Sequence, residues 1–555
     1  FGSFYVGNYA PLQLVSYMVD HALWGMRPAG FIFGNIVCHA TAGILFYALL
    51  RRFAFSREGA LSAALLFLLH PLQVESVVWI SQRKTVLAMV FYLLSLHCYL
   101  SWFRREGGIR AYLLSLGAFV AALLVKSVVV VLPLTLLLHD HCFARERRQG
   151  NFLGDKLPYL LAALAVGYLA LLSQSTEYGG GGRTGFHGGS LWATVCTMLP
   201  VYATYVRLIV WPSGLSVVYA PQIRTAADPA VIAAALAMVL LAVGAVRLYR
   251  SNRGLFFWAA AMPVGLLPVS QLIPLVTLMN DRYLYFPMLG VAACCGYLLE
   301  RILAGTAAGT RPLVVAVCTL ILVACGFLSL QRARVWQNSS ILWADATAKQ
   351  PASAVGWYML GEVQEKRSRF ADAIVAEERA REVCRGVECR LVLRKLGELY
   401  LRTNMPGKAG QRIGELLRLY PEAADGYTLS GHLSYQGGDL DRAEKAYLKA
   451  LQLDPGMVSA LSALGNVYLA TGRPELAMKQ YEAVLHAGKP SAELVYSMAC
   501  AAALMGNRRI ALERLDEALR LGYNNPDSIL QNPELDVIKG DKEFIGLMQR
   551  YFPGR

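Results

Sequence analysis

The chain is short of charged residues. Only 16% of its 555 residues are Asp, Glu, Lys or Arg, whereas ordinary globular domains carry about 25%. Acidic residues are scarcest in the first part, where eleven of the 38 precede Trp336 and where the long apolar runs also lie. These observations exclude a water-soluble fold for the whole chain. We expect a multi-spanning membrane domain over residues 1–335 and a water-soluble domain over residues 336–555.

The sequence also lacks the signatures of several kinds of site. No Cys or His spacing suits zinc, and no Ser-His-Asp order is evident. The glycine run at residues 179–182 does not precede a helix start, as a nucleotide-binding loop would. We therefore expect neither a bound metal nor a cofactor, with a divalent metal requirement left open.

Eleven cysteines are present, and most lie inside apolar segments, where they act as small hydrophobes. Cys384 and Cys389 are a close pair in the water-soluble part. They form a local disulfide if that part faces an oxidising compartment, or else they are two free thiols. The spacing alone does not decide between the two.

Apolar runs of ~20 residues are long enough to cross the hydrocarbon core as helices. Two shorter runs, 111–125 and 128–138, predict helices that meet at Lys126. Residues 191–210 are a weaker span, interrupted by Pro200 and Arg207. The fold class is therefore all-α, with about ten spanning or partly spanning helices. The main spans are residues 30–50, 60–78, 86–102, 157–173, 231–246, 255–274, 283–299 and 312–330.

Basic clusters give this bundle a direction and also explain the net charge of +15, so nucleic-acid binding is not expected. The clusters follow alternate spans and mark the cytoplasmic side. By parity, residues 191–210 begin and end outside, as a kinked, interfacial or re-entrant segment. The region after residue 330 is then outside as well. The clusters are Arg51, Arg52 and Arg57; Arg104, Arg105 and Arg110; Arg145, Arg147, Arg148 and Lys156; and Arg247, Arg250 and Arg253.

From Trp357 the sequence repeats with a period of 34 residues. Small residues recur where two helices approach closely, and an aromatic recurs where neighbours pack, which is the signature of tetratricopeptide repeats (TPR). About five repeats and a cap over residues 533–552 predict an α-solenoid. Its groove binds a peptide or protein, or the array is only a scaffold. The recurring residues are Gly397, Gly431 and Gly465; Ala409, Ala443, Ala477 and Ala511; and Tyr447 and Tyr481.

Charged side chains stand next to apolar runs on the predicted outer side. His70 and Glu75 precede Arg83 and Lys84 in a tight turn between two spans. Lys126 stands alone, and a cation at membrane depth is costly unless it reaches water or a partner. These cations either hold a lipid phosphate or anchor the turns by snorkelling to the interface, and the residues leave both open.

Three further polar residues lie near the same predicted surface. Asp281 and Arg282 precede an aromatic-rich helix start, either as a functional pair or as part of the interfacial aromatic belt. Asp20 lies on an amphipathic stretch over residues 12–24, which we expect along the outer surface. His39 lies inside a span and therefore faces protein or a cavity rather than lipid.

The order of these pieces resembles the bacterial relatives of the transmembrane-and-TPR protein O-mannosyltransferases, which are membrane glycosyltransferases of the GT-C fold. The resemblance covers nearly the whole chain, and its strength lies in the order, because each piece is weakly specific. The chain departs from the family at Thr85, where relatives often have Asp, and at Ala10, where some have Arg. The matching pieces are residues 8–12, 35–39, 70–84, Lys126, 205–219, 281–287 and the TPR array.

The resemblance implies transfer of a mannose-like sugar from a polyprenyl-phosphate donor to Ser or Thr of an extracytoplasmic protein held by the TPR array. It also implies a carboxylate that deprotonates the acceptor and cations that hold the leaving phosphate. The family's usual acidic loop would precede Phe1, so we expect the chain to be N-terminally incomplete. The expected location is the bacterial inner membrane, in contact with lipid, with the TPR domain in the periplasm. The alternative is a non-enzymatic membrane-anchored TPR scaffold for envelope or surface assembly.

The resemblance assigns roles to individual residues. The remaining acids for catalysis are Glu75, Asp20 and Asp281, and His70 shapes the site. The residues expected to bind the donor phosphate are Arg83, Lys84, Lys126 and Arg282. The supporting residues are His39 and Tyr219.

Overall fold

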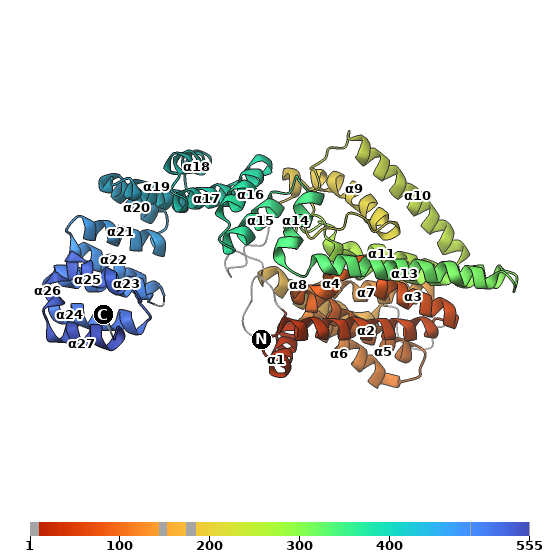
Figure 1. The fold of residues 1–555 in the computed structure, drawn as a ribbon. Helices are drawn as coiled ribbons and strands as arrows, with labels where there is room; N and C mark the ends of the chain where they lie inside the picture. The colour runs from red at the N-terminus through yellow and green to blue at the C-terminus, as the bar shows by residue number, and fades with distance from the viewer. Residues whose placement is uncertain (1–9, 144–152, 174–184, 489, 554–555) are drawn as a thin grey trace. The chain divides into compact units, whose positions relative to one another are not determined.

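The computed structural model describes residues 10–143, 153–173, 185–488 and 490–553. Regular structure in these residues is entirely helical, which confirms the all-α fold class (Figure 1). Predictions that concern residues 8–9, residues 179–182, Arg145, Arg147 and Arg148 lie outside the described residues.

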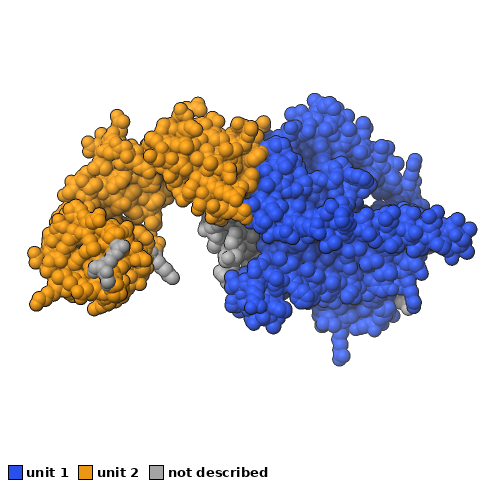
Figure 2. All heavy atoms as spheres, in the orientation of Figure 1, with its two compact units in different colours: residues 1–353 blue, residues 354–555 orange. Residues whose placement is uncertain are grey.

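The chain forms two compact units, residues 1–353 and 354–555, which we call the membrane unit and the TPR unit (Figure 2). The division falls later than the predicted boundary after residue 335, because α14 (Ser339–Lys349) belongs to the membrane unit. An ion pair of 2.8 Å between Arg332 and Asp345 holds α14 to the end of α13 (Arg311–Val335).

Among the described residues of the membrane unit, eight helices are long and apolar enough to cross a membrane. This count rests on the length and composition of the helices. It rises to nine if the bent pair Arg57–Leu69 and Pro71–Val78 is counted as one span. The α-helices before α13 are α1 (Pro11–Trp24), α2 (Pro28–Arg52), α3 (Arg57–Leu69), α4 (Val74–Val78), α5 (Arg83–Phe103), α6 (Gly108–Val125), α7 (Leu132–Cys142), α8 (Leu157–Ser173), α9 (Leu191–Val210), α10 (Pro229–Ser251), α11 (Arg253–Leu266) and α12 (Pro287–Gly305). Short 3-10 helices include η1 (Pro71–Gln73), η2 (Ile80–Gln82), η3 (Ser127–Val131) and η9 (Asp281–Leu284).

Two junctions follow directly from the sequence. The predicted span 60–78 is broken at His70 into α3 and η1–α4, which meet at a bend of 49°. Pro71 follows the bend, and a proline cannot donate the backbone hydrogen bond that would continue α3. The two predicted helices around Lys126 are present as α6 and η3–α7.

Polar contacts of the membrane unit gather at two ends of its helices. We name these the Glu75 end and the Arg52 end. The loops found at each end are the ones that the basic clusters predict to lie on the same side of the membrane. This agreement supports the predicted alternation of the spans. The Glu75 end contains the pairs Arg83–Asp20, Arg282–Glu75 and Lys126–Thr85, and the Arg52 end contains Arg52–Glu106, Ser56–Glu300 and Tyr249–His141.

Helix α9 contacts two loops of the membrane unit. Near its start, Thr197 accepts a hydrogen bond of 3.0 Å from the backbone of Arg224. In its last turn, the carbonyl of Ile209 lies 3.0 Å from His70. Residues 191–210 are also one of the helices that are long and apolar enough to cross a membrane, so the expectation that they begin and finish on one side stays a prediction.

The TPR unit contains five helix pairs followed by a short cap. In the third and fourth repeats, Gly431 and Gly465 leave room for Tyr447 and Tyr481, since a Cβ there would lie 2.3 and 2.4 Å from the rings. Cys384 and Cys389 form a disulfide between the first and second repeats. The pairs are α15 (Ala354–Lys366) with α16 (Phe370–Val383), α17 (Val387–Arg402) with α18 (Pro406–Leu419), α19 (Ala424–Gln436) with α20 (Leu440–Leu453), α21 (Val458–Ala470) with α22 (Pro474–Ala487), and α23 (Ala492–Leu504) with α24 (Arg508–Arg520). The cap contains α25 (Pro526–Gln531), η10 (Pro533–Leu535), α26 (Asp536–Lys539) and α27 (Lys542–Tyr551).

The first repeat departs from this packing at Glu377. Its position corresponds to Tyr447 and Tyr481, and the side chain lies fully buried against Gly361. Neither carboxyl oxygen has a hydrogen-bond partner among the described residues. Burial raises the pKa of Glu377 to about 9, against the opposing effect of Lys395. The side chain is therefore protonated at neutral pH.

We expect Glu377 to make the first repeat sensitive to pH. An unfolded glutamate ionises near its model value of 4.5, so the folded state binds more protons, and stability falls as the pH rises from there through about 9. Because the two states differ by nearly one proton over this window, hydrogen-exchange protection factors of α16 should fall by about tenfold per pH unit, roughly 100-fold or more between pH 6 and pH 8.5. Glu377→Gln should remove this dependence. Glu382 lies exposed on the same helix, so Glu382→Gln serves as the control. Wild-type protection factors of α16 that are the same at pH 6 and pH 8.5 would contradict the expectation.

Candidate functional site

Glu75 is buried at the Glu75 end and paired with one arginine. The bend at Pro71 turns α4 so that the Glu75 side chain is only 1% exposed. One of its oxygens accepts from the backbone N–H of Arg282 at 2.9 Å, and the other accepts from Arg282 Nη1 at 2.5 Å. The buried charge is thus paired, and the pair fixes η9 against α4.

Asp281 lies next to this pair and is hydrogen-bonded to a tyrosine. Its Oδ1 accepts from the Tyr219 hydroxyl at 2.5 Å, and the residue is 1% exposed. Burial and the neighbouring Glu75 carboxylate raise the pKa of Asp281 to about 7, although Tyr219, Arg332 and Lys349 act in the opposite direction. Burial and the neighbouring carboxylate therefore favour the protonated form of Asp281 more than in a free aspartate.

Lys84 and Lys126 add positive charge that no carboxylate among the described residues pairs directly. Both are half-buried, and Lys126 Nζ donates to Thr85 Oγ1 at 2.7 Å. Lys84 and Lys126 are close enough to interact electrostatically with each other and with Arg282. Lys84 and Lys126 thus place two basic groups beside the Glu75–Arg282 pair. Such a cluster suits a phosphate group.

Arg83 points away from this cluster and is used within the protein. Its Nη2 donates to Asp20 Oδ2 at 2.5 Å and to the carbonyl of Phe31 at 2.8 Å, and its Nε donates to Asn35 Oδ1 at 2.5 Å. Gly34 makes room for the guanidinium, because a Cβ there would lie 2.4 Å from Arg83 Nη2. Asp20 and Arg83, predicted as an acid and a phosphate ligand, therefore satisfy each other and join α1, α2 and α5.

The two predicted histidines have partners in the packing. His39 Nδ1 lies 2.7 Å from the Tyr285 hydroxyl, and its Nε2 lies 3.2 Å from the carbonyl of Leu68. His70 Nε2 lies 3.0 Å from the carbonyl of Ile209, and its Nδ1 accepts from the backbone N–H of Leu72. These contacts position helices around the site.

The structure brings six of the predicted residues into one cluster, and the others lie around it. Three neighbours were not predicted: Trp79, Arg332 and Lys349. The Arg282 guanidinium lies 5.3 Å from the centre of the Trp79 ring, and Arg332 and Lys349 both influence Asp281. Among the described residues, no three His, Cys, Asp or Glu side chains are grouped as a metal would require. The clustered residues are Glu75, Asp281, Tyr219, Lys84, Lys126 and Arg282.

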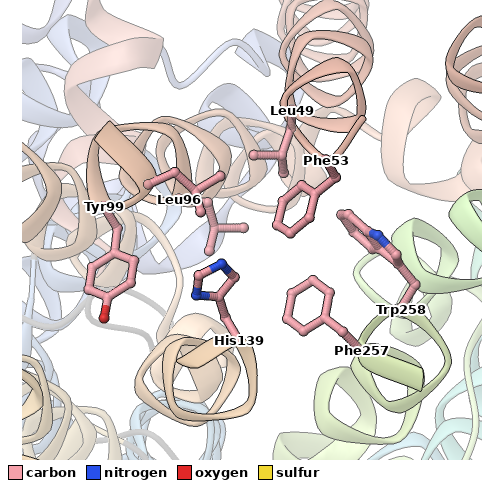
Figure 3. Close-up of a pocket in the computed structure, with 8 residues that line it drawn as sticks. Leu49, Phe53, Leu96, Tyr99, His139, Phe257 and Trp258 are labelled. Carbon is pink, nitrogen blue, oxygen red and sulfur yellow. The ribbon is translucent and has the colours of Figure 1, made fainter. Parts of the chain in front are cut away.

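A small cavity of about 10 Å³ lies at the Arg52 end (Figure 3). Figure 3 shows the rings of Phe53, His139, Phe257 and Trp258 around it, with Tyr99 at one side. Tyr99 follows Lys84 by fifteen residues on α5, which is about 22 Å along a helix. The cavity is therefore separate from the cluster around Glu75.

Family models match the chain in both units. Residues 14–173 match "Dolichyl-phosphate-mannose-protein mannosyltransferase", a range that contains Glu75, Lys84 and Lys126. Residues 394–458 and 428–493 match "Tetratricopeptide repeat". The first match ends before Asp281 and Arg282.

Curated proteins similar to the chain include protein O-mannosyl-transferases. The chain is 27% identical to the protein O-mannosyl-transferase Tmtc1 of Drosophila melanogaster over 38% of this chain and 27% of the relative. It is 23% identical to the protein O-mannosyl-transferase F38B6.6 of Caenorhabditis elegans over 64% of this chain and 51% of the relative. The chain thus spans about half or less of the length of these relatives. Together the matches make it a TMTC-like protein, with transmembrane helices followed by TPR repeats, at low identity.

Solved structures are similar to part of the chain. The crystal structure of MamA has 22% identity and a TM-score of 0.26 over 29% of this chain and 94% of MamA. The pilF structure from Pseudomonas aeruginosa has 21% identity and a TM-score of 0.31 over 35% of this chain and 88% of pilF.

Proposed function

We propose that this protein transfers a mannose-like sugar from a polyprenyl-phosphate donor to Ser or Thr hydroxyls of an extracytoplasmic protein held by the TPR unit. One observation carries the proposal: Lys84, Lys126 and Arg282 surround the buried carboxylates at the end of the membrane unit where α13 leads into α14. The mannosyltransferase relatives support the same chemistry, and no cofactor beyond the lipid-linked sugar is needed.

The cluster suits an inverting displacement. The acceptor hydroxyl oxygen attacks the anomeric carbon of the sugar, and the bond from that carbon to the phosphate oxygen breaks. Asp281, with its pKa near 7, takes the hydroxyl proton. The lipid phosphate leaves with the bonding electron pair, and Lys84, Lys126 and Arg282 stabilise its added negative charge.

The proposed location is the bacterial inner membrane, with the Glu75 end and the TPR unit on the periplasmic side. The positive-inside distribution supports this orientation, because the basic loops converge on the Arg52 end. The disulfide between Cys384 and Cys389 supports it independently, since disulfides persist in oxidising compartments.

Removing the two unpaired lysines tests the proposal. In the full-length protein in lipid nanodiscs, Lys84→Ala with Lys126→Ala should lower transfer of mannose from polyprenyl-phosphate mannose to a Ser/Thr-rich peptide at least tenfold. Each charge-assisted contact to phosphate contributes roughly 1.5–3 kcal/mol. Arg110→Ala, an exposed basic residue at the Arg52 end, should leave transfer unchanged. Wild-type protein that neither binds this donor nor transfers its sugar would contradict the proposal and favour the non-enzymatic scaffold.

A further inference from the structure

Buried polar atoms without partners are concentrated beside Asp281. Six buried side-chain atoms of Gln73, Ser76, Arg332 and Trp336 find no hydrogen-bond partner among the described residues. They are both amide atoms of Gln73, the Ser76 hydroxyl, Nε and Nη2 of Arg332, and the indole nitrogen of Trp336. Such groups are costly in a protein interior, so their concentration in one place calls for a ligand.

The four side chains lie along one contact, between η1–α4 and the end of α13. At its start, Ser329 of α13 donates to the carbonyl of Leu69 at 2.7 Å. Seven residues later, just past the end of α13, the Trp336 ring lies 5.8 Å from the ring of Trp79. Arg332 stands between these two contacts on α13, and Gln73 and Ser76 stand between them on the other segment. The unpaired atoms therefore belong to one interface.

The unpaired atoms have the chemistry of a carbohydrate site. Gln73 and Ser76 can both donate and accept, while Arg332 and Trp336 only donate. A sugar hydroxyl does both, whereas a phosphate accepts only and would leave the Gln73 carbonyl unpaired. The Trp79 and Trp336 rings add apolar surface of the kind that covers the C–H face of a pyranose.

We propose that Gln73, Ser76, Arg332 and Trp336 bind the hexose of the lipid-linked donor while Lys84 and Lys126 bind its phosphate. This inference rests on the proposed function and assigns the sugar its own residues. The two groups are joined through contacts: Arg282 interacts with Lys84 and lies 5.3 Å from the Trp79 ring, which neighbours Trp336. Arg332 interacts electrostatically with Asp281, so the proposed base adjoins the sugar site.

The test compares two lipids on the full-length protein in nanodiscs: polyprenyl phosphate with mannose and the same lipid without it. Wild type should bind the mannose-bearing lipid about tenfold more tightly, and Gln73→Leu and Ser76→Ala should each lower that preference roughly fivefold. Neither variant should alter the affinity for bare polyprenyl phosphate. Lys126→Ala, by contrast, should weaken binding of both lipids equally. Gln73→Leu should also raise the melting temperature, because it removes an unpaired buried amide, which shows that the variant is folded.

The outcomes separate this inference from the proposed function. Wild type that binds both lipids equally, or variants that keep the full preference for mannose, would overturn the sugar site while leaving donor binding intact. Wild type that binds neither lipid would overturn the proposed function, and the sugar site with it.

Discussion

Asp281→Asn is expected to slow sugar transfer by roughly 10²–10⁴-fold, the usual contribution of a general base. Wild-type transfer should rise with pH through about 7, because Asp281 must be ionised to accept the proton and burial beside Glu75 sets its pKa there. The variant should lose this rise along with its activity. Initial rates from pH 5.5 to 8.5 at saturating donor measure both effects.

Tyr219→Phe is the matched variant for this prediction. The Tyr219 hydrogen bond lowers the pKa of Asp281, so its loss should move the rise in activity to higher pH while retaining the base. A pH profile of Asp281→Asn that matches wild type at every pH would show that another carboxylate takes the proton. Glu75→Gln would then be the variant to measure, and full activity in both would refute the assignment of the site.

Arg83→Ala is expected to lower the free energy of unfolding by about 3–5 kcal/mol, because it leaves the buried Asp20 carboxylate without its partner. Arg83→Lys should recover only part of this loss, since an ammonium cannot reproduce the separate bonds of Nε to Asn35 and Nη2 to Asp20. Denaturant-induced unfolding in mixed micelles gives the comparison, with exposed Arg250→Ala as the control.

A double variant separates stability from donor binding. Asp20→Asn combined with Arg83→Gln should restore much of the stability, because no charge is then left unpaired. Donor affinity per folded molecule should stay near wild type in these variants. If Arg83→Ala were instead as stable as wild type but failed to bind polyprenyl phosphate, Arg83 would contact the donor, as its position in the sequence suggested.

The elements of the fold could be predicted from the sequence because each depends on a local pattern. Apolar length predicts the spans, Pro71 predicts the break after α3, and the 34-residue period predicts the five helix pairs. The repeat pattern also identifies Glu377 as unusual, because it stands four residues after Ala373, where the other repeats have Tyr, Ile or Leu. Only the structure shows that it has no partner.

The pairings in the site could not be predicted, because they join residues far apart in the chain. Glu75 and Arg282 are separated by 207 residues, and Asp20 and Arg83 by 63. In the sequence, Arg83 and Lys84 are adjacent cations of the same kind. One turns to Asp20, the other remains without a carboxylate, and no local pattern distinguishes them. Arg332 and Lys349 read as ordinary basic residues after the last span, and only folding brings them to Asp281.

The position of α13 and α14 also has a consequence for biogenesis. Arg332 acts on Asp281, and Lys349 donates to the carbonyl of Leu215 at 3.0 Å, so the last membrane helix and the segment after it complete a site begun by α4. Synthesis from the N-terminus delivers these residues after every other helix of the membrane unit. A chain that ends before α13 lacks both Arg332 and Lys349, so the environment of Asp281 depends on residues that are synthesised late.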